Sequence, residues 1–342
     1  MKKALITGIN GQDGSYLAEF LLGKGYEVFG LMRRLSVPNL DHIKHIIKDI
    51  KIFDGDLLDA GSISRAVKES MPDEVYNLAA QSFVATSWHQ PILTGEITAL
   101  GAVRVLEAVR NIKPDARFYQ ASSSEMFGNT SDEYINENSP MWATSPYAIA
   151  KLYAHRMTIN YRESFDMFTT SGILFNHESK RRGLEFATRK ITYGVACIAN
   201  GITTSKMANE NKRPIVEDGK IKLGDLTSSR DWGYAKDYVE AMWMMLQAER
   251  PDDYVIATGV NTSVGDFAKK AFAVAGITDW QNHIVQDPAF LRPSDLKHLR
   301  GDITKFKTQL GWSPKTGIDE LIKIMVESDI NLVEKTEKIN GR

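Results

Sequence analysis

A tyrosine and a lysine four residues apart, Tyr147 and Lys151, lie in a helical pattern of this 342-residue chain. Residues i and i+4 share one face of a helix, so the two side chains are neighbours. An ammonium beside a phenol lowers the pKa of the phenol, which then can act as a general base near neutral pH. Tyr-x-x-x-Lys also arises by chance, so its place in the fold decides what it indicates.

A serine and a glutamate, Ser123 and Glu125, stand at the end of a predicted strand over residues 117–124. Positions i and i+2 of a strand share a face, so both side chains can point into one site. The hydroxyl can bind a substrate oxygen, and the carboxylate can move a proton. The alternative is a serine-rich strand end with a solvated glutamate. Beside Tyr147 and Lys151, we favour a catalytic set.

The elements that must position these residues alternate along the first half of the chain. Apolar runs predict strands, and longer helical patterns lie between them. Such alternation predicts an α/β fold, a Rossmann-type doubly wound parallel sheet with helices on both faces. The predicted strands are 3–7, 27–32, 51–56, 74–80, 117–124 and 168–176, with helices near 14–24, 61–70, 93–111 and 145–163.

The first predicted strand leads into a glycine-rich turn and then a helix. Glycines there permit a tight turn and a close backbone approach to a pyrophosphate, and the helix N-terminus favours its charge. The spacing G-x-x-G-x-x-G is weak as a string, but its place after the first strand favours a dinucleotide site over a purely structural turn. The predicted binding residues are Gly8, Asn10, Gly11, Gln12, Asp13 and Gly14.

The end of the second predicted strand indicates which dinucleotide binds. NAD sites usually carry an acidic residue there, whereas this chain has Arg33 and Arg34. Two guanidiniums suit a 2′-phosphate, so NADP is predicted, with two solvated arginines as the alternative. Further cofactor contacts are expected at the carboxyl ends of the third and fourth strands, from Asp56, Leu57, Leu78, Ala79, Ala80 and Ser82.

Composition limits the remaining classes. Lys plus Arg is 42 and Asp plus Glu is 43, which argues against nucleic-acid binding. We expect no membrane span, no signal segment and a cytoplasmic protein, because no long apolar run occurs. Cys197 is the sole cysteine, and the seven histidines show no ligand spacing, so no metal site is predicted.

Several longer segments resemble the extended short-chain dehydrogenase/reductase family and, within it, the GDP-mannose 4,6-dehydratases. The resemblance covers nearly the whole chain, and FNHES followed by RRG and RDWG is its most specific part. It implies a GDP-sugar substrate, an NADP cofactor and a lyase activity in deoxysugar biosynthesis. The segments are residues 4–22, 75–82, 118–128, 145–151, 172–183, 229–243, 256–259, 287–293 and 310–314.

The resemblance also implies roles for the catalytic residues. Tyr147, assisted by Lys151, takes the proton of the sugar 4-hydroxyl while hydride passes to NADP⁺, and Ser123 orients that oxygen. Glu125 then removes the C5 proton and protonates the leaving 6-hydroxyl. The hydride returns to C6, which gives GDP-4-keto-6-deoxymannose and water.

Binding residues and assembly follow from the same resemblance. His177 and Arg182 are expected at the cofactor, together with Tyr147 and Lys151. The segments 33–39 and 181–183 resemble those that meet across subunits, so a homotetramer is expected, with a dimer as the alternative. The substrate residues are expected to be Ser82, Ser123, Glu125, Asn176, Lys190, Arg230 and Arg292.

Two domains are expected. Residues 1–176 form the NADP-binding domain, to which the segment at about 229–260 returns, and residues 177–342 mainly form a smaller α/β GDP-sugar-binding domain. The polar stretch 203–220 is expected to be a loop or mobile insertion, and it is longer than the family pattern.

Four other functions stay open. The chain could dehydrate GDP-D-glycero-D-manno-heptose, or act as a nucleotide-sugar decarboxylase, epimerase or reductase. A non-catalytic NADP-binding regulator is more remote, because the set Ser123, Glu125, Tyr147 and Lys151 is complete.

Overall fold

The computed structural model describes residues 1–291 and 299–336. The chain forms two compact units, each built from three segments. The first consists of Met1–Phe175, Ala235–Ala257 and Gly301–Ser313, and the second of Asn176–Tyr234, Thr258–Arg300 and Pro314–Arg342. Arg292, one of the predicted substrate residues, lies outside the described residues.

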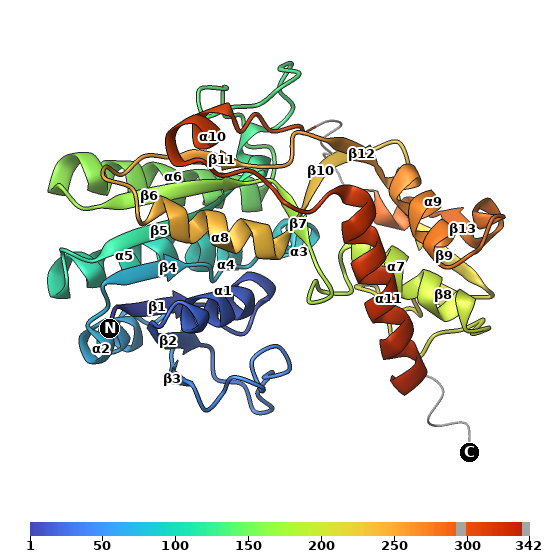
Figure 1. The fold of residues 1–342 in the computed structure, drawn as a ribbon, viewed down its shortest axis with the longest axis horizontal. Coiled ribbons are helices and arrows are strands. Elements are labelled where there is room, and N and C mark those ends of the chain that lie inside the picture. Colours follow the sequence, from blue (N-terminus) through green and yellow to red (C-terminus); the bar gives the residue numbers. More distant parts are fainter. Residues whose placement is uncertain (292–298, 337–342) are drawn as a thin grey trace. The chain divides into compact units, whose positions relative to one another are not determined.

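The first unit is built on a seven-stranded sheet in which all neighbouring strands are parallel (Figure 1). The strand order β11-β6-β5-β4-β1-β2-β3 reverses direction between β1 and β4, which is where open α/β sheets bind ligands. This confirms the predicted fold class. The strands are β1 (Lys3–Thr7), β2 (Glu27–Met32), β3 (Ile50–Asp54), β4 (Glu74–Asn77), β5 (Arg117–Ser123), β6 (Thr169–Leu174) and β11 (Tyr254–Ile256).

Helices cover both faces of this sheet (Figure 1). Strand β1 shows why, because Ala4 and Ile6 belong to one apolar core and Leu5 to another on the opposite face. The first core includes side chains of α1 (Gln12–Gly23), α8 (Ala235–Met245) and α10 (Thr304–Leu310). The second includes side chains of α2 (Ala60–Ser70), α5 (Gly101–Ile112) and α6 (Pro146–Phe165).

A series of short helical turns links β4 to α5. It consists of α3 (Val84–His89), α4 (Pro91–Thr94) and the π-helix η1 (Gly95–Leu100). A 3₁₀ turn, η2 (Ser124–Phe127), continues directly from β5. The sequence predicted one helix over 93–111, whereas the structure divides this stretch between α4, η1 and α5.

The second unit carries two three-stranded sheets and three long helices. One sheet has the order β12-β10-β7 and the other β13-β9-β8. The strands are β7 (Asn176–Glu178), β8 (Val216–Glu217), β9 (Lys220–Leu223), β10 (Ser229–Tyr234), β12 (Asn261–Ser263) and β13 (Ile284–Gln286). One apolar core joins α7 (Ala187–Ala199), α9 (Val264–Val274) and α11 (Ile318–Thr336).

A buried ion pair fastens α11 to α7 within the second unit. The guanidinium of Arg189 binds the carboxylate of Asp329, which is fully buried, and the Thr192 hydroxyl donates to the same carboxylate at 2.7 Å. Burial raises the pKa of Asp329, and the Arg189 charge opposes that rise. Removing either partner leaves a buried charge without its counter-ion, which is strongly destabilising.

Strand ends differ from the predicted ones by a few residues. The predicted strand 74–80 ends at Asn77 as β4, because the backbone N–H groups of Leu78 and Ala79 both donate to the Thr7 hydroxyl at 3.0 Å. The predicted strand 168–176 divides into β6 and β7. The predicted loop 203–220 contains the short strand β8 and an ordered set of backbone hydrogen bonds.

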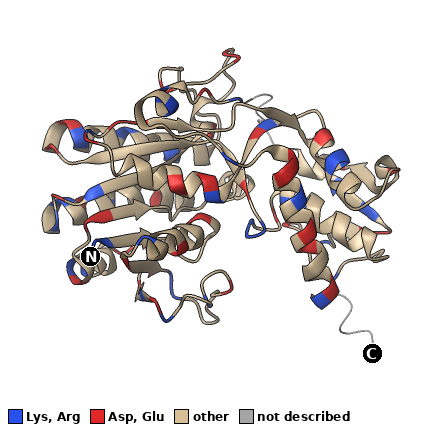
Figure 2. Ribbon diagram, viewed as in Figure 1, with Lys and Arg blue, Asp and Glu red and all other residues tan. Residues whose placement is uncertain are grey.

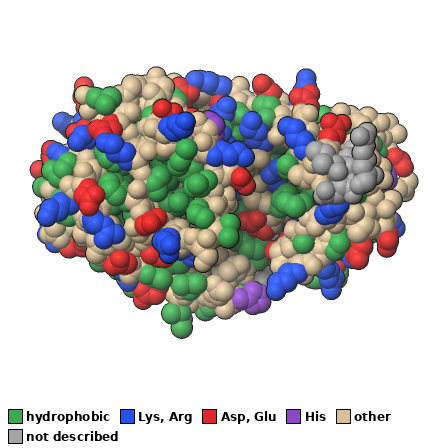
Figure 3. Space-filling model, turned by 90° about the horizontal axis from the view of Figure 1, so that it is seen from below, with side chains coloured by type: hydrophobic (Ala, Val, Ile, Leu, Met, Phe, Trp, Pro, Cys, Tyr) green, Lys and Arg blue, Asp and Glu red, His purple; other side chains and the backbone are tan. Residues whose placement is uncertain are grey.

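Charged side chains of both signs are interspersed over the elements (Figure 2) and over the face seen in Figure 3, where apolar side chains lie among them. No helix among residues 1–291 and 299–336 combines the length and apolar character that crossing a bilayer requires.

Candidate active site

The glycine-rich turn after β1 has the geometry that a dinucleotide requires. Gly8 has φ +70°, and its N–H donates to the Leu31 carbonyl, while the Gly11 N–H donates back to Gly8 at 3.0 Å. A Cβ on Gly14 would lie 2.3 Å from the Gly8 carbonyl oxygen, so only glycine fits there. Helix α1 starts at Gln12 without a side-chain cap. This cradle fits the pyrophosphate of a dinucleotide.

The neighbouring strand ends converge on this turn. A Cβ on Gly8 would lie 3.1 Å from Ala79, so the end of β4 approaches the turn closely. The Thr7 hydroxyl donates to Asn77 at 2.8 Å and accepts from the two residues that follow Asn77. Thr7 is therefore a positioning residue that the sequence did not reveal. Ala80 is half-buried, and Ser82 is exposed.

The arginines at the end of β2 are placed as expected. Arg33 and Arg34 follow Met32 directly, and both are exposed. The Asn10 side-chain amide donates to the Asn39 carbonyl at 3.1 Å, which ties the segment after β2 to the glycine turn. Exposed guanidiniums on a segment attached to this turn suit a phosphate on the adenosine half of the cofactor.

The end of β3 is held by local hydrogen bonds. Asp56 accepts from the Leu58 N–H at 3.0 Å, and its own N–H donates to Ser62 Oγ at 3.2 Å. Leu57 is buried, and a Cβ on Gly101 would lie 2.9 Å from the Leu57 Cβ. Leu57 thus packs between the strand end and α5.

Ser123 and Glu125 lie where β5 passes into η2. Ser123 is buried, and its Oγ accepts from the Glu125 N–H at 3.3 Å. This hydrogen bond caps the 3₁₀ turn and holds the two residues in a fixed relation. Glu125 is half-buried.

Tyr147 and Lys151 occupy the first turns of α6, and the start of this helix is well specified. Ser145 Oγ accepts from the Ala148 N–H at 3.1 Å, and Pro146 is the first helical residue. Serine at the cap and proline at the first position are the usual signals of a helix start. Both Tyr147 and Lys151 are buried.

Lys151 connects α6 to the strand that carries Ser123. Its Nζ donates to the Ala121 carbonyl at 2.7 Å and lies 5.9 Å from the centroid of the Tyr147 ring. Burial lowers the pKa of Lys151 to about 8, and the carboxylate of Asp13 opposes this shift. The structure therefore brings a phenol, an ammonium, a hydroxyl and a carboxylate to the carboxyl end of β5.

The predicted binding residues described in the second unit lie on two adjacent strands, on one helix and, for Arg182, in the loop between β7 and α7. Asn176 and His177 are on β7, which pairs in parallel with β10. Arg230 is on β10, is buried, and donates to the Ser229 carbonyl at 2.8 Å. Arg182 forms an ion pair with Glu178 at 3.2 Å and lies 3.5 Å from the Phe186 ring centroid.

Lys190 lies on α7 and is buried. Its Nζ donates to Glu210 Oε1 at 2.8 Å and lies 4.2 Å from the centroid of the Phe290 ring. The sequence predicted Lys190 but gave no sign of Glu210, because a carboxylate inside a polar loop has no pattern that identifies its partner.

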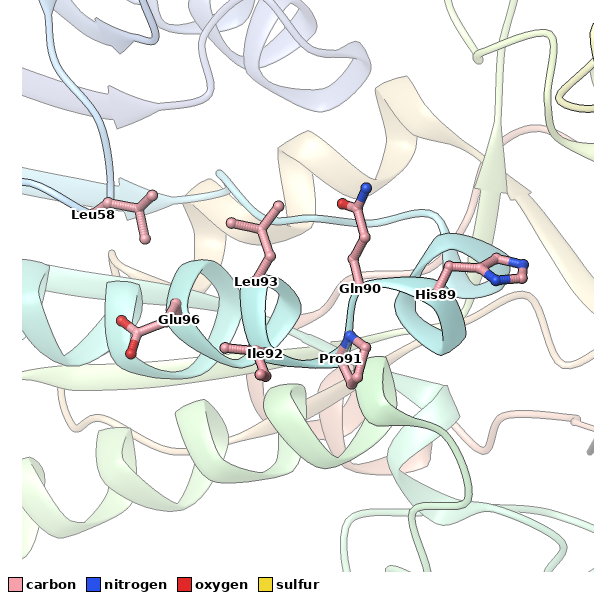
Figure 4. A pocket seen from close by; sticks show the side chains of 7 residues that line it. All are labelled: Leu58, His89, Gln90, Pro91, Ile92, Leu93 and Glu96. Carbon is pink, nitrogen blue, oxygen red and sulfur yellow. The ribbon is translucent and has the colours of Figure 1, made fainter.

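A pocket of about 570 Å³ also lies on the first unit (Figure 4). None of the predicted catalytic residues lines it, and its walls are largely apolar. The lining residues are Leu58, His89, Gln90, Pro91, Ile92, Leu93 and Glu96.

The fold and this set of residues define an extended short-chain dehydrogenase/reductase. A solved UDP-glucose 4-epimerase from Thermotoga maritima, crystallised with UDP-glucose, has the same fold, with a TM-score of 0.83 at 22% identity over 97% of this chain and 100% of that chain.

Comparison with known sequences narrows the class. A family model described as GDP-mannose 4,6 dehydratase matches residues 5–325. GDP-mannose 4,6 dehydratase 1 of Arabidopsis thaliana is 47% identical, over 99% of this chain and 92% of its own length. GDP-mannose 4,6-dehydratase of Vibrio cholerae is 42% identical, over 98% of this chain and 95% of its own length. The chain belongs to the GDP-mannose 4,6-dehydratase family, which confirms the resemblance inferred from its sequence.

Proposed function

We propose that the chain removes water from GDP-mannose to give GDP-4-keto-6-deoxymannose. The chain is a hydro-lyase of the GDP-mannose 4,6-dehydratase type that uses NADP, as its family membership indicates. One observation carries the residue assignment. The hydrogen bond from Lys151 to Ala121 supports this assignment, because it joins the helix of Tyr147 to β5, which ends at Ser123 and continues into the turn that carries Glu125.

The cofactor residues have a defined division of labour in this proposal. The glycine turn and the N-terminus of α1 bind the pyrophosphate, Arg33 and Arg34 bind the 2′-phosphate, and the ends of β3 and β4 line the adenosine and nicotinamide halves. His177 and Arg182 contribute further contacts. When bound, NADP supplies the chemistry of accepting a hydride from the sugar and returning it.

Tyr147 begins the reaction by accepting the proton of the 4-hydroxyl. The buried ammonium of Lys151 stabilises the phenolate form, since opposite charges attract strongly where water is excluded. Ser123 donates a hydrogen bond to the sugar O4 and so aligns this oxygen with Tyr147. Once C4 has also given up its hydride, which bound NADP would accept, C4 is a ketone.

Glu125 carries the elimination. The 4-keto group makes the C5 proton acidic, and the Glu125 carboxylate accepts it. The electron pair of the broken C5–H bond forms the C5–C6 double bond as the C6–O bond breaks. Glu125 returns its proton to the departing oxygen, which leaves as water, so the carboxylate regains its starting state. Return of the hydride to C6 would then leave C5 to take up one proton. Tyr147 can supply it, because it holds the proton of the former 4-hydroxyl, and so Tyr147 also regains its starting state.

Binding of the GDP-sugar falls to residues of complementary charge. Lys190, Arg230 and Arg292 provide cations for the diphosphate, Asn176 provides an amide, and Ser82 provides a hydroxyl. We propose that the unit built on the seven-stranded sheet binds NADP and that the other unit binds the GDP-sugar. This assignment develops the expected division at residues 1–176, about 229–260, and 177–342.

The identity of the sugar is open to direct test. The purified chain is incubated separately with GDP-mannose, GDP-D-glycero-D-manno-heptose, UDP-glucuronate and dTDP-glucose, and each product is weighed by mass spectrometry. We expect loss of one water from GDP-mannose at the highest rate. Faster loss from the heptose would reassign the substrate, and no loss from either GDP-sugar would contradict the proposed reaction.

We further propose a homotetramer in the cytoplasm, with a dimer as the smaller alternative. Apolar side chains are exposed on adjoining helices of the first unit, among them Ile92 at 82% and Ile149 at 57% exposure. A second copy of the chain that covers them would gain the free energy of burying apolar surface. The segments 33–39 and 181–183 are proposed as further subunit contacts.

A further inference from the structure

The loop over residues 203–220, which we expect to be longer than the family pattern, holds a carboxylate against Lys190. The side chains of Lys190 and Glu210 are 6% and 19% exposed, and Nζ lies 2.8 Å from Oε1. Water screens such a pair weakly, so the ammonium is largely neutralised by Glu210. Any anion that binds Lys190 must therefore compete with this loop.

The base of the loop is firmly attached to the second unit. Ser205 is buried, and its Oγ accepts from the N–H groups of Ile215 and Val216, at 3.0 and 3.1 Å. Ile215 and Val216 are themselves buried in the core of this unit. The start and the end of the loop are thus joined to each other and to the core.

The tip of the loop is a small unit with its own hydrogen bonds. Asn209 Oδ1 accepts from the N–H groups of Asn211 and Arg213, at 2.9 and 3.2 Å, and the Asn209 N–H donates to the Arg213 carbonyl at 2.8 Å. Asn211 and Arg213 are exposed. These hydrogen bonds hold the tip in the conformation in which Glu210 contacts Lys190. All of them lie within the tip, so they stay intact if the tip moves away as one piece.

Only one carboxylate oxygen of Glu210, the one that accepts from Lys190 on α7, has a hydrogen bond in the described part of the chain. Glu210 Oε2 is buried and has no hydrogen-bond partner in the described part of the chain. A buried carboxylate oxygen without a partner costs free energy, so this arrangement of the loop is easier to displace than a fully bonded one. Lys190 keeps a second partner, since its Nζ lies 4.2 Å from the Phe290 ring centroid.

We propose that Glu210 is a substrate-displaced counter-ion of Lys190, which sets the affinity of this chain for the diphosphate of its nucleotide-sugar. The inference rests on the proposed role of Lys190 in binding GDP. The incoming diphosphate replaces the carboxylate at the ammonium, and Glu210 leaves with the loop tip. Because Glu210 competes for Lys190, the apparent affinity equals the intrinsic affinity multiplied by the fraction of time that Lys190 is available.

The test compares single substitutions by titration calorimetry with GDP on the NADP-loaded full chain. Glu210→Gln removes the charge and keeps the shape of the side chain. Glu217→Gln is the matched control, because Glu217 of the same loop pairs with Lys222 on β9 at a half-exposed site. If Lys190 is available to GDP about one tenth of the time, Glu210→Gln should lower the dissociation constant of GDP about tenfold. The control should not change it, and kcat/KM for GDP-mannose should rise with the GDP affinity.

Two further measurements separate the possible failures. Guanosine, which has no phosphate, should bind the Glu210→Gln variant and the unaltered chain equally, because the competition concerns the diphosphate. Lys190→Gln should weaken GDP binding, and an unchanged affinity would remove Lys190 from the GDP site and overturn the inference with that part of the proposed function. If Lys190→Gln weakens binding but Glu210→Gln binds GDP no more tightly than the unaltered chain, the counter-ion role alone is overturned.

Discussion

The ammonium of Lys151 donates a 2.7 Å hydrogen bond to the carbonyl oxygen of Ala121. This single bond joins the helix that carries Tyr147 to the strand that ends at Ser123. It also keeps a cation inside the protein, where burial lowers the pKa of Lys151 to about 8 from its usual 10.5. A buried charge that lowers the stability of the fold is typical of functional sites, because such sites need side chains with shifted pKa values.

This cost can be measured as a function of pH in the cofactor-free chain. Since the folded pKa of Lys151 is below the unfolded one, the unfolded chain binds more protons between about pH 8 and pH 10.5. The stability of the unaltered chain should therefore rise across this window relative to Lys151→Met. At pH 7 the variant should be more stable by on the order of 3 kcal/mol, less the lost hydrogen bond. Denaturant unfolding of both chains at pH 7, 8, 9 and 10 tests this. A difference in the free energy of unfolding that stays constant over this range would contradict it.

Glu125→Gln should abolish dehydration and leave binding intact. The amide cannot accept the C5 proton, and loss of a general acid–base group typically costs a factor of about 10² to 10⁴ in rate. The measurement is loss of one water from GDP-mannose by mass spectrometry, with GDP and NADP affinities determined in parallel. Glu163→Gln, an exposed position on α6, serves as the control. Dehydration at the normal rate would remove Glu125 from the mechanism.

The paired change Arg33→Ala and Arg34→Ala should reduce the preference for NADP over NAD. Hydrogen bonds to charged groups are worth about 1.5 to 3 kcal/mol, so loss of one or both contacts should weaken NADP binding at least tenfold. NAD has no 2′-phosphate, and its affinity should hardly change. Calorimetry with both cofactors checks the ratio, and Lys44→Ala, an exposed cation near the same segment, controls for net charge. A ratio that stays constant places the 2′-phosphate elsewhere.

Gly14→Ala should prevent NADP binding and destabilise the chain. Its Cβ would lie 2.3 Å from the Gly8 carbonyl oxygen, so the turn must open. We expect a loss of about 3 kcal/mol in the free energy of unfolding. Gly23→Ala in the same helix meets nothing within 4 Å and should stabilise by up to about 1 kcal/mol. Thermal melts of both variants, with and without NADP, test this difference. A melting temperature of Gly14→Ala equal to that of the unaltered chain would contradict the prediction.

Ile149→Glu should reduce the number of subunits. Ile149 and Tyr153 are exposed one turn apart on α6, so a charge at Ile149 would be buried if a second copy packs there. Sedimentation velocity should then show a species of half or a quarter of the original mass, while Glu163→Gln keeps the original assembly. An unchanged mass for Ile149→Glu would exclude this helix face from the subunit contact.

The sheet, and the elements that carry the proposed catalytic residues, could be predicted because their signals are local. Apolar strand runs, the glycine turn and the Ser145–Pro146 helix start each specify structure within a few residues. The predicted strands 3–7 and 27–32 agree with β1 and β2 to the residue. Residue types at a strand end then indicated Ser123 and Glu125, and the helical spacing to Lys151 indicated Tyr147.

The remaining features depend on contacts between distant residues. Lys190 and Glu210 are 20 residues apart, and nothing in a polar loop identifies which cation its carboxylate will meet. Thr7 ends β4 early because its hydroxyl accepts two backbone N–H groups 71 and 72 residues away. Such tertiary hydrogen bonds override local propensity at strand ends.

The division of both units among three chain segments has a consequence during translation. The seven-stranded sheet lacks its edge strand β11 until residues 254–256 leave the ribosome, and the Trp312 indole, which donates to the Asp237 carbonyl, follows later still. In the second unit, Arg189 forms its ion pair only after Asp329, 140 residues later, has been made. Neither unit can therefore close until its last segment has been made, which is Gly301–Ser313 in the first unit and the segment from Pro314 in the second. A truncation before residue 301 should therefore disable both units together, because it removes a segment of each.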